Sequence, residues 1–209
     1  MIDTPYHLTD EWKAAVATIG ANVQKANRTP FETVVNYLIS DPVLKNGLES
    51  IILLLNEHKI KPAWYHTSHY QCKYKGENIV SIKIGDGYKH IPNLIRINVR
   101  TTMRDNLDCF GLSLTNEMRN IMTNSFIKCN SCGHTERGPC DNIANFKFNG
   151  NTYNSICHMS IIVGFTIEAT TPDLDKQFEM IKNFIRAKIM FNNANRDKIA
   201  QMKGPVRGL

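Results

Sequence analysis

The first sixty residues carry apolar side chains at helical spacing. Apolar positions recur every three or four residues in three successive segments, which predicts helices over 10–25, 30–39 and 42–58. Thr29 is a suitable N-cap for the second helix, with Pro30 in its first turn and Glu32 able to close a capping box. Asp41-Pro42 repeats this arrangement at the third helix. We therefore predict a helical N-terminal section over residues 1–60.

From residue 61 the pattern changes to alternation with a period of two. Segments 69–75, 79–84 and 94–100 each place apolar residues on one face and polar residues on the other. The turn-forming sequences Lys75-Gly76 and Gly85-Asp86-Gly87 separate them. This order predicts an antiparallel meander with one buried face and one polar face.

The last third of the chain mixes both patterns. We predict a helix over 114–126, and then a hairpin of 145–148 with 151–156, because Asn149-Gly150 favours a type I′ turn. The second strand is expected to run on to Ile167, and Thr171-Pro172-Asp173 to cap a closing helix. The fold class is α+β. We expect a single domain, 1–209, with its helical section (1–60), its sheet, cysteine loop and final helix (61–191) and a frayed tail (192–209).

The composition indicates the class of protein and the compartment in which we expect it. The chain has 209 residues, of which 42% are hydrophobic and 21% charged, which is ordinary for a protein with a sizeable core. No apolar run is long enough to cross a bilayer and no export signal is visible, so we expect a cytoplasmic protein without a membrane partner. In that reducing compartment the six cysteines are metal ligands or free thiols. The net charge of +6 allows an anionic partner.

Four cysteines have the spacing of a metal site. Cys129 and Cys132 form a C-x2-C pair before a glycine, Cys140 follows, and the predicted hairpin can carry Cys157 back beside them. Four thiolates are typical of a closed, tetrahedral structural zinc site, so we predict Zn²⁺ as the cofactor. His134 is the alternative fourth ligand. The competing interpretation is a set of ordinary buried thiols.

A catalytic zinc is the next possibility. His134-Thr135-Glu136 followed by Pro139-Cys140 partly matches the pattern of zinc deaminases. The match fails because Ile143 stands where that pattern needs its second cysteine. A closed four-thiolate site also leaves no position for a reactive water. We therefore predict no catalytic residues and a non-enzymatic protein.

The polar face of the meander is the candidate binding surface. Its basic members could bind phosphates or another anion, and they are Lys73, Lys83, Arg96 and Arg100, beside His69, Gln71, Lys75, Ser81 and Asn98. The alternative is an ordinary solvated sheet face. Tyr70 and Tyr74 fall on the opposite face, so the pattern of a nucleic-acid stacking platform is absent.

A second candidate surrounds the entry to the first strand. Trp64, His66 and His69 could line a pocket for a ligand. The alternative here is a core tryptophan beside exposed histidines.

The motif order from 61 to 190 resembles a known group of proteins. Lys61-Pro62-Ala63-Trp64-Tyr65, the Ile-rich strands, the C-x2-C-Gly knuckle, the Asn-Gly hairpin and the last cysteine are similar to uncharacterised small cysteine-rich proteins of clostridia and related Firmicutes. The resemblance implies a bacterial α+β protein in which Cys129, Cys132, Cys140 and Cys157 hold the metal. It implies no activity.

These observations favour a zinc-stabilised binding protein for a small molecule or a protein partner. The first alternative is association with nucleic acid through the basic sheet face. The second is an enzyme of unknown reaction with its site near Trp64–Tyr70.

Overall fold

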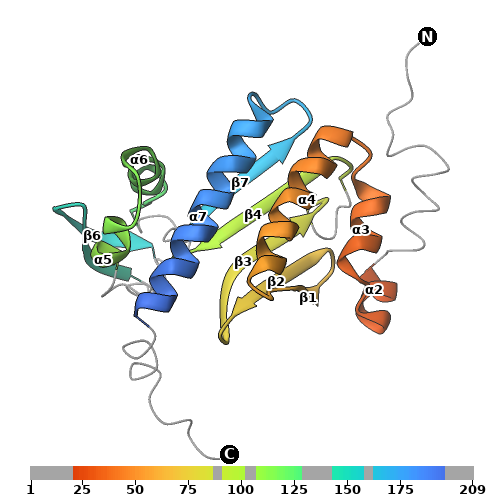
Figure 1. Ribbon diagram of the computed structural model, residues 1–209, viewed down its shortest axis with the longest axis horizontal. Coiled ribbons are helices and arrows are strands. Elements are labelled where there is room, and N and C mark those ends of the chain that lie inside the picture. The colour runs from red at the N-terminus through yellow and green to blue at the C-terminus, as the bar shows by residue number, and fades with distance from the viewer. Residues whose placement is uncertain (1–20, 87–90, 102–106, 129–142, 158–161, 196–209) are drawn as a thin grey trace, which may run out of the picture. The chain divides into compact units, whose positions relative to one another are not determined.

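The computed structural model describes residues 21–86, 91–101, 107–128, 143–157 and 162–195 (Figure 1). Most of the first predicted helix, three of the four cysteines (Cys129, Cys132 and Cys140), His134 and the tail after 195 lie outside the described residues.

The described residues form helices and two sheets, which confirms the predicted α+β class. The helices are α2 (Ala21–Asn27), α3 (Phe31–Leu38), α4 (Pro42–Glu57), α5 (Leu107–Leu112), α6 (Asn116–Asn124) and α7 (Leu174–Ala194). The strands are β1 (Pro62–His66), β2 (His69–Tyr74), β3 (Glu77–Ile84), β4 (Leu94–Arg100), β5 (Ile143–Phe148), β6 (Asn151–Cys157) and β7 (Ile162–Glu168). The chain divides into two compact units, 1–100 with 164–182, and 101–163 with 183–209. The prediction of a single domain stays a prediction.

The first unit is built on a five-stranded sheet with the order β1-β2-β3-β4-β7. Strands β1 to β4 follow one another as antiparallel hairpins. Strands β2 to β4 form the meander that the sequence predicted. Strand β7 returns from a distant part of the chain to lie beside β4 and runs antiparallel to it (Figure 1).

One face of this sheet carries buried apolar side chains. The fully buried residues of this face include Tyr70, Cys72, Val80, Ile82, Ile84, Ile95, Ile97 and Val99. Leu44, Leu48, Ile51 and Leu55 of α4 are equally buried, and α4 and α7 lie across the same face of the sheet (Figure 1). Burying each such side chain contributes about 1.5–3 kcal/mol, so this layer dominates the stability of the unit.

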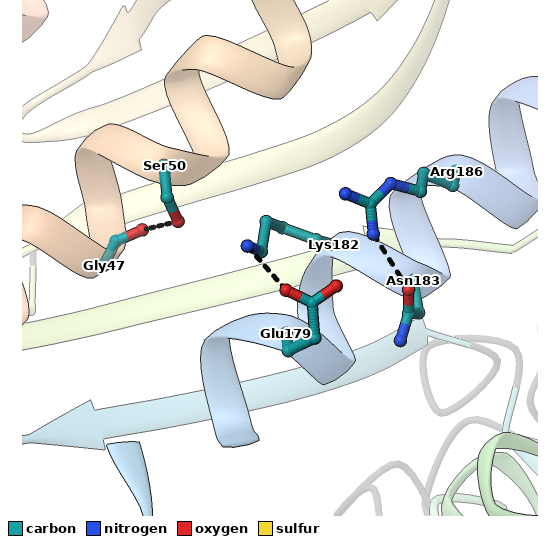
Figure 2. A network of polar contacts seen from close by, with 6 residues as sticks. All are labelled: Gly47, Ser50, Glu179, Lys182, Asn183 and Arg186. Atoms are coloured by element: carbon teal, nitrogen blue, oxygen red, sulfur yellow. Dashed lines mark hydrogen bonds and ion pairs between the residues drawn. The ribbon is translucent and has the colours of Figure 1, made fainter. Parts of the chain in front are cut away.

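Helix α4 packs against α7 at a glycine. A β-carbon on Gly47 would lie 2.1 Å from Cε2 of Phe178, which is itself buried. Figure 2 shows the polar contacts that run along each helix beside this point. The Ser50 hydroxyl donates to the Gly47 carbonyl at 2.7 Å, and Lys182 pairs with Glu179 at 2.6 Å. Farther along α7, Arg186 donates to the side chain of Asn183 at 3.0 Å.

The second unit contains α5, α6, the β5–β6 hairpin and the end of α7. Asn149 and Gly150 both have positive φ, 51° and 76°, as the predicted type I′ turn requires. Phe126 packs edge-on against Phe146, Phe148 and Tyr153, with ring centroids 5.0–5.5 Å apart. This aromatic cluster is the apolar centre of the hairpin.

Several local predictions need correction. The second strand of the hairpin does not continue as one strand to Ile167, because β6 ends at Cys157 and β7 joins the other sheet. Strand β1 and the short helix α5 were not predicted. The N-cap of α3 is Pro30, not Thr29, and it makes no side-chain cap hydrogen bond. Asp41 does cap α4, since its carboxylate accepts from the Leu44 N–H at 2.9 Å.

Candidate functional site

Four polar side chains form a row across four neighbouring strands. The strand registers place His66 of β1 opposite His69 of β2, His69 opposite Lys83 of β3, and Lys83 opposite Arg96 of β4. Directly opposed residues of antiparallel strands project from the same face and lie about 5 Å apart. The row, named here the basic row (His66, His69, Lys83 and Arg96), therefore occupies the sheet face opposite the apolar core.

A bulge in β1 brings His66 into this row. The register shifts between Trp64, which is opposite Tyr70, and His66, which is opposite His69. Tyr65 is the extra residue, and its ring contacts the rings of both histidines, with centroids 5.1 and 5.2 Å away. Tyr65 is 55% exposed, so it forms the solvent side of this aromatic group.

The two histidines are in direct contact. Nδ1 of His69 lies 2.7 Å from Nε2 of His66, a hydrogen bond in which one ring must donate and the other accept. Two imidazolium rings would place two donors against each other, so at most one ring of the pair carries a charge while the bond holds. At neutral pH the pair is therefore joined by a hydrogen bond between the two rings.

Helix α2 holds the turn that carries the histidines. The side-chain carbonyl of Gln24 accepts from the Ser68 N–H at 2.6 Å, and its amide nitrogen donates to the Ser68 hydroxyl at 2.9 Å. Gln24, Thr67 and Ser68 are all buried. Since Ser68 adopts a positive φ of 50°, these bonds stabilise a backbone conformation that serine rarely adopts.

Burial and neighbouring cations keep the histidines neutral. Burial is the main cause that lowers the pKa of His69 to about 4, and His66, Lys83 and Arg100 add to it. Burial also lowers the pKa of His66, followed by Lys83, while the backbone at Thr67 acts in the opposite direction. The positive charge of this face at neutral pH therefore comes from Lys83, Arg96 and Arg100.

The rest of the face is also polar. Gln71, Ser81 and Asn98 form a second row, and Ser81 at its centre is only 2% exposed. At the edge of the basic row, Nη1 of Arg96 pairs with Asp86 at 2.9 Å, which offsets part of its charge. Lys83 and Arg100 are therefore the main positive charges that can attract an anion to this face.

The structure separates the predicted ligand-binding residues into two groups. It brings His66, His69, Lys83 and Arg96 together, with Arg100 close enough to act on His69. Trp64 is opposite Tyr70 and so belongs to the apolar face. Lys73 is exposed on the polar face of β2, two residues beyond Gln71, where β3 carries a bulge at Ile79. The alternative of exposed histidines is wrong for His69, which is only 8% exposed.

Sequence reasoning missed three contributors to this site. Tyr65 reaches the histidines because of the bulge, Gln24 because α2 packs beside the β1–β2 turn, and Asp86 because its turn returns toward Arg96. The pair Gly85-Asp86 signalled a turn, but nothing in the local pattern identifies a bulge or a partner 44 residues away.

The thiols outside the cysteine loop offer no nucleophile at this face. Cys72 lies on the apolar face, and burial raises its pKa to about 12, so the thiol stays protonated. Cys109 is exposed on α5 in the second unit.

The predicted metal ligands are described only in part. Cys157 is the last residue of β6, and its directly paired neighbour is Ile143, the first residue of β5. On its other side, the Cys157 N–H donates to the Ile127 carbonyl at 2.8 Å, and Lys128 bridges to Ile156. The stretches that lead into Cys129 and out of the loop after Cys140 thus both lie beside Cys157. Within the described ranges no three ligand side chains cluster, but the other three cysteines are outside them.

Comparison with known proteins gives no relative. No protein-family model, curated protein or solved structure matches this chain. The resemblance to the clostridial group stays a prediction. Among the described helices, none combines the length and the apolar character that a bilayer crossing requires.

Proposed function

We propose that the protein is a non-enzymatic binding protein that holds a small anionic molecule on the polar face of its five-stranded sheet. The observation that carries this proposal is the basic row, in which His66, His69, Lys83 and Arg96 stand side by side across four strands.

The arrangement of the cations supports an anion in particular. Lys83 lies opposite His69, Arg100 lies farther along the same face of β4, and both cations contribute to the lowered pKa of His69. A hydrogen bond from a cation to a bound anion contributes about 1.5–3 kcal/mol. Two such groups on a rigid sheet are enough for binding of a small organic acid or phosphate ester.

The size of the anion follows from what surrounds the row. A single-stranded nucleic acid needs successive aromatic platforms beside its cations. Tyr70 is buried on the opposite face, and Tyr65 is the aromatic residue that adjoins the row. We therefore favour a small ligand over nucleic acid, and an oligonucleotide becomes one arm of the test.

We further propose a structural zinc held by Cys129, Cys132, Cys140 and Cys157. What supports it is the position of Cys157 between Ile127 and Ile143, the described residues that flank the cysteine loop. Closure by a zinc ion would fix this loop to the end of β6, and a four-thiolate site supplies stability without chemistry.

The anion proposal can be tested by NMR titration. Inorganic phosphate, citrate and a ten-residue oligothymidylate are added separately at constant low ionic strength, while the amides of His69, Lys83 and Asn98 are followed. We expect saturable shifts with a small anion. The double variant Lys83→Gln/Arg100→Gln should weaken that binding at least about ten-fold, because each lost charge-assisted bond corresponds to a factor of ten or more.

Lys59→Gln is the matched control, since Lys59 is an exposed lysine in the turn after α4. It should leave the titration unchanged. If no anion shifts these amides, the proposal is wrong. If only the oligonucleotide binds, with affinity that falls steeply with salt, the nucleic-acid alternative replaces it.

A further inference from the structure

An apolar groove lies between helices α3 and α4, away from the basic row. It has a volume of about 410 Å³, within the range of sites for small molecules. Its apolar lining comes from Phe31, Val35, Leu48, Ile52 and Leu53. Leu53 is 65% exposed, so an apolar side chain already faces solvent at this groove.

The floor of the groove is rigid. The Phe31 ring packs edge-on against Tyr70 of β2, with centroids 5.1 Å apart, and the Tyr70 hydroxyl donates to the Thr29 carbonyl at 2.7 Å. Val35 and Leu48 are buried in the same layer. The groove therefore rests on the core of the sheet and is preformed.

A hydrogen bond between the helices closes one end. Nζ of Lys45 donates to the side-chain oxygen of Asn36 at 2.9 Å, across the gap from α4 to α3. A peptide helix running along the groove would meet this bond. The closed end favours a small molecule over a peptide.

Two carboxylates stand one helical turn from the closed end. Glu32 is four residues before Asn36 on α3, and Glu49 is four residues after Lys45 on α4, so the two acids reach the same level of the groove. Both are exposed, and within the described parts of the chain neither has an ion-pair or hydrogen-bond partner. The single cation of the lining, Lys45, is held at the closed end by Asn36.

We propose that this groove binds a small molecule that has an apolar body and one positively charged amine. The apolar body lies over Val35, Leu48 and Leu53, and the amine lies between Glu32 and Glu49. This site is separate from the proposed anion site, which lies on the other face of the sheet. The groove selects a positively charged ligand, whereas the other site selects a negatively charged one.

Three probes of similar shape test the proposal by NMR titration of the full chain. They are 2-phenylethylamine, which is cationic at neutral pH, the neutral 2-phenylethanol and the anionic 3-phenylpropionate. We expect the methyl signals of Val35, Leu48 and Leu53 to shift with the amine. The amine should bind about ten-fold more tightly than the alcohol, since each exposed ion pair contributes up to a few-fold. The carboxylate should bind more weakly than the alcohol.

Two sets of variants separate charge from apolar contact. Glu32→Gln/Glu49→Gln should bring the amine to the affinity of the alcohol, whereas Glu57→Gln, at the exposed end of α4, should change nothing. Leu53→Ala should weaken the binding of the amine and of the alcohol together. Leu53 is exposed, so the variant should fold normally, and its NMR spectrum checks this. Equal affinity of all three probes for the unmodified protein, or no shift of the three methyl signals with any probe, overturns the proposal.

Discussion

The pKa of His69 is lowered by several neighbours acting together. The ring is buried, bonded to His66, and close to Lys83 and Arg100. Each of these neighbours disfavours a proton on His69, and together with burial they lower its pKa to about 4. An unfolded chain would return the ring to an ordinary pKa near 6.5. The stability of the protein must therefore depend on pH through this residue.

We expect the free energy of unfolding to fall as the pH is lowered from about 6.5 to about 4. In that window the unfolded state binds the His69 proton and the folded state does not, so acid favours unfolding. Above it the ring is neutral in both states, and below it the ring is protonated in both. The loss should be about 2–3 kcal/mol, because each pKa unit corresponds to about 1.4 kcal/mol. Urea unfolding at several pH values measures it.

The comparison variant for this prediction is His69→Gln, which removes the titrating group and keeps a polar side chain. Its stability should depend less on pH than that of the unmodified protein over the same window. His58→Gln, a histidine at the end of α4, should retain the original dependence. Parallel curves for His69→Gln and the unmodified protein would contradict the argument.

The sequence could predict the residues of the polar face but not their environment. Alternation in β2, β3 and β4 correctly placed His69, Lys83 and Arg96 on one face. The burial of His69 depends on a bulge in β1 and on the Gln24–Ser68 bonds from α2. Both are tertiary features, and neither leaves a mark in the local pattern of polar and apolar residues.

At the scale of the elements, the packing of α4 against α7 requires a residue without a side chain at position 47. At Gly47 the two helices come so close that Phe178 occupies the space of a β-carbon. Glycine in a helix is usually unfavourable by about 1 kcal/mol relative to alanine. Here the packing against Phe178 compensates for that cost.

Gly47→Ala should consequently destabilise the protein, although alanine is the better helix former. Overlap with the buried Phe178 ring forces one helix or the ring to move, which costs about 1–3 kcal/mol after the gain in helix propensity. Thermal unfolding measures the effect. Asn46→Ala, at the exposed neighbouring position of α4, is the control and should be neutral or slightly stabilising.

Adding Phe178→Leu to Gly47→Ala should recover part of the lost stability, because leucine is smaller than phenylalanine and leaves room for the β-carbon at position 47. A Gly47→Ala variant as stable as the unmodified protein would show that the helices can separate without cost.

Elements were predictable where the pattern was long and local. The meander and α4 were found because each has a clear period and a turn or cap at its ends. Strand β1 was missed because it is a short edge strand that begins with Pro62, and α5 because its six residues are too few to show a period. The partner of β7 could not be inferred, since alternation identifies a strand but not the distant strand beside it.

At the scale of the whole chain, one unit interrupts the other. β4 ends at Arg100 and the first unit resumes at Gly164, yet β4 and β7 are neighbours in the sheet. The chain between Arg100 and Ile162 thus leaves the sheet at the end of β4 and returns to it at the start of β7, the neighbouring strand. Because those strand ends are close together, such an excursion costs little for the sheet itself. The proposed zinc ligands lie in this stretch between β4 and β7, so loss of the metal should destabilise the stretch and leave the five-stranded sheet unchanged.

Cys157→Ser should lower the zinc content of the purified protein to well below one ion per chain, because three thiolates hold zinc less tightly than four. Elemental analysis by mass spectrometry measures the metal. Hydrogen exchange should then become faster in β5 and β6 and stay unchanged in β2 to β4. Cys109→Ser, at an exposed cysteine of the same unit, is the control. An unmodified protein that contains no zinc would show that the metal prediction is wrong.

The bulge in β1 has a consequence for how this site can change in evolution. Without the bulge, regular pairing would continue from Trp64–Tyr70 and set Tyr65 opposite His69. Loss of Tyr65 itself, however, would move His66 up by one position and keep it opposite His69. Position 65 can therefore vary in length as well as in identity while the histidine pair persists.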